Sequence, residues 1–121
     1  MKDFRNLKVW EKAHRLTLEI YGITRLFPKE ELYGLTSQIR RSASSIPTNI
    51  AEGCGRGSDA DFKRFLQIVF GSASETEYLL LLSKDLKYTD SSKIEIRSGN
   101  VEEIKKMLSS LIQKIKNNIE R

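Results

Sequence analysis

Apolar residues recur every three or four positions along most of the chain, the spacing that places side chains on one face of an α-helix. No segment shows the alternation expected of a strand. Four helical stripes can be separated: Val9, Ala13, Leu16, Ile20, Ile23 and Phe27; Leu35, Ile39, Ala43, Ile46 and Ile50; Phe62, Leu66, Val69, Ala73, Thr76 and Leu80; and Ile94, Val101, Ile104, Leu108, Leu111, Ile115 and Ile119. Short connections at 28–32, 54–58 and 88–90 make successive helices antiparallel neighbours. The pattern predicts an all-α fold, an antiparallel up-down-up-down four-helix bundle formed by residues 1–121 as one domain.

Local signals set the expected helix boundaries. Pro28 ends the first helix, the second begins at Leu32 or Leu35, and Ser58 can cap the third through the free amides of its first turn. Pro47 lies inside the second helix and has no amide proton, so the carbonyl of Ala43 loses its helical partner. We therefore expect a kink near Pro47, with nearby hydroxyls meeting the freed groups: those of Ser44, Ser45 and Thr48.

Three glycines on alternate positions, Gly53, Gly55 and Gly57, lie between the second and third stripes. A phosphate-binding loop would need a preceding strand with its own glycine spacing, or a Gly-Lys-Ser/Thr end, and the chain has neither. Glycine ends helices well because it accepts positive φ, so we interpret this stretch as a helix-to-helix turn. Small residues at 42–45 and 71–74 predict two places where neighbouring helices approach closely.

Composition excludes several classes of protein. The chain has 121 residues and a net charge of +5, with a sequence pI near 9.4. It has no apolar run near the ~20 residues of a membrane span, and the charged N-terminal stretch is unlike a secretory signal. Cys54 is the single cysteine, which rules out an intramolecular disulfide. We expect a cytoplasmic protein with no membrane partner.

Residues that could carry catalysis are scarce. His14 is the only histidine, so neither a histidine-rich metal site nor a di-metal bundle can form. Glu75 and Glu77 are two positions apart and point to different faces of a helix, so they cannot share a proton. We expect no catalytic residues, no metal, no cofactor and no enzyme activity.

Two surface features bear on partners. A polar row on the second helix is either a solvated face or a contact surface: Gln38, Arg41, Ser45, Thr48 and Glu52. Apolar residues also exceed what one stripe needs, on the third helix around Phe65 and on the first at Trp10, Leu18 and Tyr21. This surplus predicts self-association; the alternative is a thicker core.

The stretches "FRNLKVWEKAHRLTLEIY" and "YGLTSQIRRSASSIPTNIAEGCGRGSDADFKRFLQIVFGSASETEYLLLLSKDL" closely resemble a known family. It comprises the four-helix-bundle proteins encoded in intervening sequences of bacterial 23S ribosomal RNA genes. Relatives include the accessory variability determinants of diversity-generating retroelements. The resemblance covers Phe4 to about Tyr88. It implies a ring-like homopentamer and, for the retroelement members, binding to nucleic acid and to a reverse transcriptase.

The resemblance and the residues together give the expected sites. We expect partner or subunit contacts at Trp10, Gln38, Asn49, Glu52 and Phe65. We expect nucleic-acid contacts at Arg40, Arg41, Arg56, Lys63 and Arg64, joined by Lys105 and Lys106. No motif that reads base edges is present, so binding would use backbone phosphates. The expected function is that of a non-enzymatic oligomeric accessory protein that binds RNA or DNA and assists a reverse transcriptase. The alternative is a structural or protein-interaction module with no nucleic-acid role.

Overall fold

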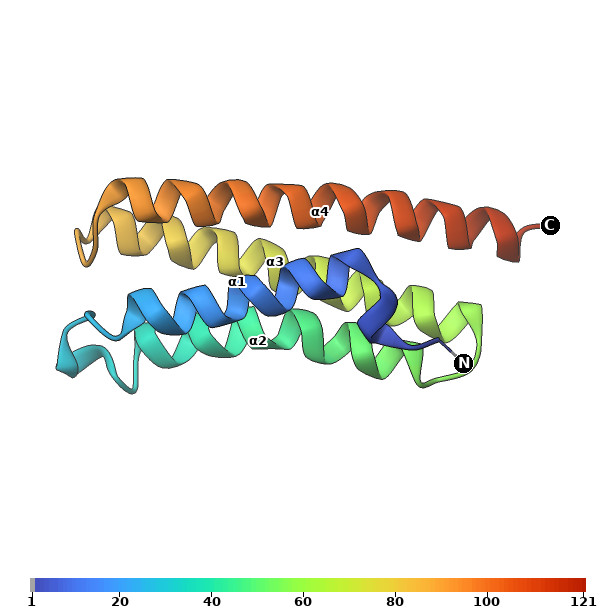
Figure 1. The fold of residues 1–121 in the computed structure, drawn as a ribbon, viewed down its shortest axis with the longest axis horizontal. Coiled ribbons are helices and arrows are strands. Elements are labelled where there is room, and N and C mark those ends of the chain that lie inside the picture. Colours follow the sequence, from blue (N-terminus) through green and yellow to red (C-terminus); the bar gives the residue numbers. More distant parts are fainter. Residues whose placement is uncertain (1) are drawn as a thin grey trace.

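A computed structural model describes residues 2–121 as four long α-helices joined by short turns (Figure 1). The helices are α1 Lys8–Thr24, α2 Leu35–Cys54, α3 Asp59–Asp85 and α4 Ser91–Ile119, with 3-10 turns η1 at Phe4–Asn6 and η2 at Lys29–Glu31. Each helix packs against the next, and α4 also packs against α1. The helices therefore form a four-sided bundle with α2 diagonal to α4. No strand occurs between residues 2 and 121, and the predicted fold class is confirmed.

The predicted stripes form the core. Every stripe residue of α1, α2 and α3 is buried, and so are Ile94 to Leu108 and Ile115 of the α4 stripe. The exceptions are Leu111, which is half-buried, and Ile119, which is exposed. Their exposure follows from helix length, because α4 has 29 residues and α1 only 17, about 43 Å against 25 Å at 1.5 Å per residue. The carboxyl end of α4 extends past the other helices (Figure 1).

The expected helix ends are also found. α1 ends at Thr24, shortly before Pro28. The amide of Asp61 donates to Ser58 Oγ at 3.1 Å, which is the predicted cap of α3. Gly57 has a φ of +86° in the turn between α2 and α3, a conformation that favours glycine. The glycine-rich stretch is thus the helix-to-helix turn that the sequence indicates.

Pro47 is buried within α2, which is helical on both sides of it. The expectation that Ser44, Ser45 and Thr48 meet the freed carbonyl of Ala43 is wrong. Thr17 Oγ1 of α1 lies 3.2 Å from that carbonyl oxygen and 2.8 Å from the carbonyl oxygen of Ala13, so one proton serves the two acceptors. A kink at Pro47 stays a prediction.

Members of the two small-residue patches contact each other between α2 and α3, and the sequence predicts a close helix approach at each patch. Ser45 Oγ and Ser72 Oγ are 2.6 Å apart, and Thr76 Oγ1 donates to Ser42 Oγ at 2.9 Å. Hydrogen bonds this short between side chains of two helices require a close approach of the backbones. α2 and α3 therefore form a tight pair inside the bundle.

Candidate functional site

The five cations predicted to bind nucleic acid form two groups. Arg40 and Arg41 lie in the first half of α2, whereas Arg56, Lys63 and Arg64 lie at the α2–α3 turn and the start of α3. Arg41 and Arg56 are 15 positions apart, which corresponds to about 23 Å at the helical rise of 1.5 Å per residue. The predicted residues therefore border the two ends of one helix face and do not make a single cluster.

Arg40 is fixed in the junction between α1 and α2. Its Nε donates to Thr24 Oγ1 at 2.8 Å, and its guanidinium lies 4.8 Å from the centre of the Tyr21 ring. No carboxylate of residues 2–121 lies within ion-pair distance of it; the ion pairs in this region belong to Arg41, Arg56 and Arg64. Its charge is thus held in place without being neutralised.

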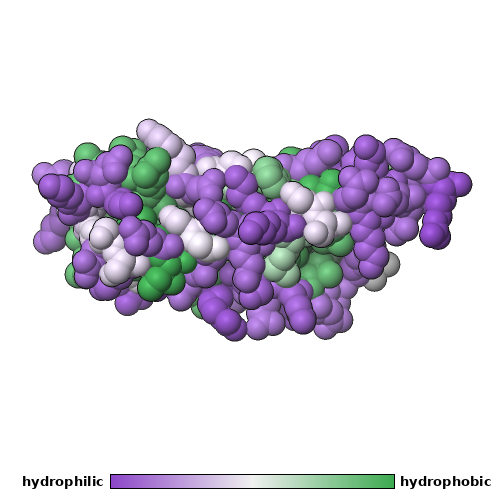
Figure 2. Space-filling view, turned by 90° about the horizontal axis from the view of Figure 1, so that it is seen from above, coloured by the Kyte–Doolittle hydropathy of each residue, from purple (hydrophilic) through white to green (hydrophobic). Residues whose placement is uncertain are grey.

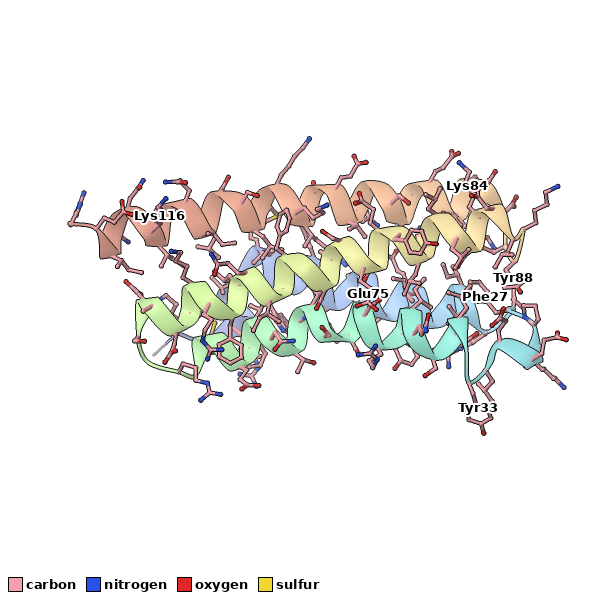
Figure 3. The ribbon with its side chains drawn as sticks, turned by 180° about the vertical axis from the view of Figure 1, so that it is seen from behind. Phe27, Tyr33, Glu75, Lys84, Tyr88 and Lys116 are labelled. Atoms are coloured by element: carbon pink, nitrogen blue, oxygen red, sulfur yellow. The ribbon has the colours of Figure 1, made fainter. Side chains whose placement is uncertain are left out.

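Arg41 projects from α2 with 74% of its side-chain surface exposed. Its nearest carboxylate is that of Glu75 on α3, at 4.0 Å, the outer limit of an ion pair. Figure 3 shows Glu75 midway along the bundle, where α3 faces α2. An exposed pair at this distance contributes little to stability, between about 0 and 1 kcal/mol, so Arg41 is free to bind another anion.

The second group is more strongly paired within the chain. Arg56 Nη2 lies 2.7 Å from Glu52 Oε2, and Arg64 Nε lies 3.6 Å from Asp61 Oδ1. Both guanidinium groups also lie over the Phe65 ring, at 5.0 and 4.7 Å from its centre. Lys63 forms no ion pair with another described residue. In this group it is the cation most available to a ligand.

From residue 35 to residue 51, the outward face of α2 carries hydroxyl and amide groups and no acid. Residues 35–51 include two arginines and no aspartate or glutamate. Ser37, Gln38 and Thr48 are exposed, and Ser44 and Ser45 are half-buried. Such groups are the usual donors to phosphate oxygens. We refer to these residues, together with Arg40 and Arg41, as the α2 face.

The predicted contact residues have diverse surroundings. Phe65 is only 5% exposed within a single chain, so its assignment to the surplus apolar surface is wrong. The physical reason is Gly53 on α2, which has no side chain and leaves room for the Phe65 ring: a Cβ at Gly53 would lie 2.8 Å from Phe65 Cβ. Phe62, Leu66, Val69, Leu79 and Leu80 of α3 are buried as well.

The other contact candidates lie nearer the surface. Trp10 is half-buried between Phe4, with ring centres 4.8 Å apart, and His14, whose ring is stacked at 5.0 Å. Gln38 is exposed. The remaining two are engaged within α2, since Asn49 donates to the Ser45 carbonyl at 2.8 Å and Glu52 pairs with Arg56. These geometries leave Trp10 and Gln38 available as contact residues.

Part of the surplus apolar surface does remain exposed. On α1 and α3 it comprises Leu18, Tyr21, Ile68, Tyr78 and Leu81. The α1–α2 loop adds Leu26, Leu32 and Tyr33, which the sequence pattern does not indicate because a loop shows no helical period. Tyr33 is 94% exposed and points away from the bundle (Figure 3).

A groove between α1 and α4 is likewise not indicated by the sequence pattern. It has a volume of about 460 Å³ and is lined by residues of both helices and of the segment before α1: Leu7, Lys8, Val9, Lys106, Met107, Ser110, Leu111 and Lys114. We call it the α1–α4 groove. Figure 2 views the side of the molecule that carries α4, where hydrophobic areas show between hydrophilic side chains. Of the two lysines added to the predicted binding set, Lys106 lines this groove and Lys105 pairs with Glu77 at 3.1 Å.

Titratable groups with altered pKa values hold structure and form no reactive cluster. Burial raises the pKa of the Cys54 thiol, which disfavours the reactive thiolate. The Tyr88 hydroxyl donates to Glu31 Oε2 at 2.7 Å, and the Leu35 amide donates to the same carboxylate at 3.1 Å. These bonds lower the pKa of Glu31 and raise that of Tyr88, and they connect the loops at one end of the bundle.

Metal sites and membrane spans are both absent from residues 2–121. No group of three or more histidine, cysteine, aspartate or glutamate side chains is placed to hold a metal ion in this range. No helix in this part of the chain is both long enough and apolar enough to cross a membrane.

Comparison with known proteins identifies the family. Residues 5–110 match the family described as 23S rRNA-intervening sequence protein. A crystal structure from Bacteroides thetaiotaomicron is similar, with 32% sequence identity and a TM-score of 0.79 over 86% of this chain and 97% of that one. It is described as a protein with unknown function from the S23 ribosomal protein family. Among proteins with curated descriptions, none matches. With most of its length matched, the chain belongs to the 23S rRNA-intervening sequence protein family.

Proposed function

We propose that the protein is a non-enzymatic, self-associating accessory protein that binds nucleic acid through backbone phosphates on the α2 face. The observation that supports this most directly is the acid-free stretch from residue 35 to residue 51. It presents Arg41 in an exposed position beside hydroxyl and amide donors. Phosphate contacts of this kind fix position without reading sequence, so we expect little sequence preference.

Self-association would strengthen such binding. The apolar residues exposed on α1 and α3 are candidates for subunit contacts, and the family resemblance implies a pentamer. Five copies of a chain with net charge +5 would present the α2 face five times, and linked weak contacts raise avidity without new chemistry. Light scattering tests this part of the proposal, since a solution mass of 13.9 kDa would refute self-association.

Binding is tested with fluorescently labelled RNA and DNA of mixed sequence, single-stranded and duplex, in a salt titration that starts near 50 mM, where phosphate contacts are strong. The variant is Arg40→Gln with Arg41→Gln, the two cations of the α2 face. The matched control, Lys29→Gln with Lys93→Gln, removes equal charge from exposed lysines elsewhere. We expect the first pair to reduce the log–log salt slope on duplex by about 0.9 for each phosphate that is no longer neutralised, and the control to leave the slope unchanged.

The result can contradict the proposal in two ways. Equal effects of both pairs would mean that only the overall positive field attracts the polyanion, and the α2 face would be the wrong site. Absence of binding near 50 mM salt would refute the nucleic-acid function itself. The second candidate function, a protein-interaction module, would then take first place, and the exposed Leu26 and Tyr33 favour it. Assistance to a reverse transcriptase is the narrower form of the proposal, and its test is co-purification with such an enzyme encoded nearby.

A further inference from the structure

The α1–α4 groove exists because the two helices that form it differ in length. α1 begins at Lys8, and the chain before it turns away through Leu7 into η1. α4 continues to Ile119, so its last turns have no α1 beside them. The space that a longer α1 would fill remains as a trough along one side of α4. Its lining includes α4 residues from Lys106 to Lys114, a stretch against which an additional helix can pack.

The floor of the groove is aliphatic. It is formed by Leu7, Val9, Met107 and Leu111. Met107 and Leu111 are four residues apart and follow one another along α4, as neighbours on one helix face do. No aromatic side chain lines the groove, so it lacks the stacking platform that unpaired bases use. The floor therefore favours an aliphatic stripe of a protein over a nucleic acid.

The rim of the groove is cationic. Lys8, Lys106 and Lys114 line it, all three are exposed, and no aspartate or glutamate does so. Within residues 2–121 the ion pairs of this region belong to neighbours outside the groove, Lys12 with Glu103 and Lys105 with Glu77. Three unneutralised ammonium groups around an apolar floor are complementary to an apolar stripe bordered by carboxylates.

We propose that the α1–α4 groove binds an acidic amphipathic helix of a partner protein. Apolar side chains of that helix at positions i, i+3 or i+4, and i+7 would rest on Met107 and Leu111, and flanking carboxylates would pair with the three lysines. Lys106 and Lys114 are eight positions apart, which corresponds to about 12 Å of α4, so a helix of two to three turns fills the groove. This site shares no residue with the α2 face and does not depend on nucleic-acid binding.

The test uses a synthetic acidic peptide with leucines at helical spacing and glutamates at the other positions. The chain has two methionines, so protein labelled with ¹³C at the methionine methyl groups gives two signals, and that of Met107 reports directly on the groove. Two control peptides separate the contributions: one has lysine in place of glutamate, and one has serine in place of leucine. The groove variant is Lys106→Glu with Lys114→Glu. Its matched control is Lys29→Glu with Lys93→Glu, the same charge change at exposed lysines elsewhere.

We expect the acidic leucine peptide to shift the Met107 signal in a saturable way, and neither control peptide to do so. The groove variant should weaken binding at least tenfold, while its matched control binds as the unaltered protein does. A circular dichroism melt confirms that both variants are folded. The proposal is overturned if the Met107 signal does not move, or if the two variants bind equally. It is also overturned if the signal responds instead to single-stranded RNA or to protein concentration alone, which would assign the groove to nucleic acid or to a second copy.

Discussion

Gly53 controls the distance between α2 and α3, and its replacement by alanine tests the packing of that pair. A Cβ at this position would lie 2.8 Å from Phe65 Cβ and 3.1 Å from Phe62 Cδ1. Phe65 Cβ moves only with its backbone, so α3 itself has to shift. Overpacking of this kind costs about 1–3 kcal/mol, and the higher helix propensity of alanine offsets at most about 1 kcal/mol. With the full offset, we expect a net loss of up to about 2 kcal/mol.

That loss can be measured as a change in melting temperature. A chain of this length unfolds with an entropy near 0.25 kcal/mol/K, so each kcal/mol corresponds to about 4 °C. Gly53→Ala should therefore lower Tm by up to about 8 °C. Gly71→Ala on α3 is the matched control, because a Cβ at Gly71 meets nothing within 4 Å. It should raise Tm by about 2–4 °C through helix propensity alone. Protein concentration is kept constant, since association shifts Tm. If Gly53→Ala were as stable as Gly71→Ala, the inferred close approach of the two helices would be wrong.

Two further predictions concern single hydrogen bonds. Thr17→Val leaves the buried carbonyl of Ala43 without a donor and should lower the free energy of unfolding by about 1–3 kcal/mol. This loss should be smaller in a Pro47→Ala background, where the restored amide donates to that carbonyl. If denaturant unfolding gave the same loss in both backgrounds, the interpretation would be wrong. Glu31→Gln should lower Tm at neutral pH, because the charged carboxylate accepts from Tyr88. The pKa of Glu31 is lowered from 4.5 in the folded state, so this stabilisation is present above pH 4.5 and is lost as the pH falls through the folded-state pKa. A Tm difference between Glu31→Gln and the unaltered protein that persists unchanged at pH 3 would refute this prediction.

The fold was predictable from the sequence because burial follows helical period. The stripe from Val9 to Phe27 is buried at every predicted position. With 3.6 residues per turn, this spacing places all of these side chains on one face of the helix. Helix ends were predictable where one residue type determines them, as Ser58 and Gly57 show. In each case the signal is local, so a single segment of sequence is enough to contain it.

The features that the sequence did not predict depend on contacts between distant segments. Thr17 meets the carbonyl freed by Pro47 from another helix, 26 residues away from Ala43. Phe65 is buried because Gly53 lies opposite it, which no period within α3 reveals. The α1–α4 groove results from the unequal lengths of two helices that lie side by side. For the candidate site, residue type indicated which cations to consider, but only the structure shows that Arg56 and Arg64 are paired while Lys63 is not.

The arrangement of the helices keeps the two proposed binding surfaces apart. α2 and α4 lie on opposite corners of the bundle and do not pack against each other within residues 2–121. A ligand on the α2 face therefore leaves the α1–α4 groove open, and one protein could hold a nucleic acid and a partner helix together. α2 is joined to α3 by short hydrogen bonds, so the face that would position phosphates is backed by tight packing. Because the two sites share no residues or neighbours, the free-energy effects of altering them should add, which is the behaviour expected of a protein that brings two partners together.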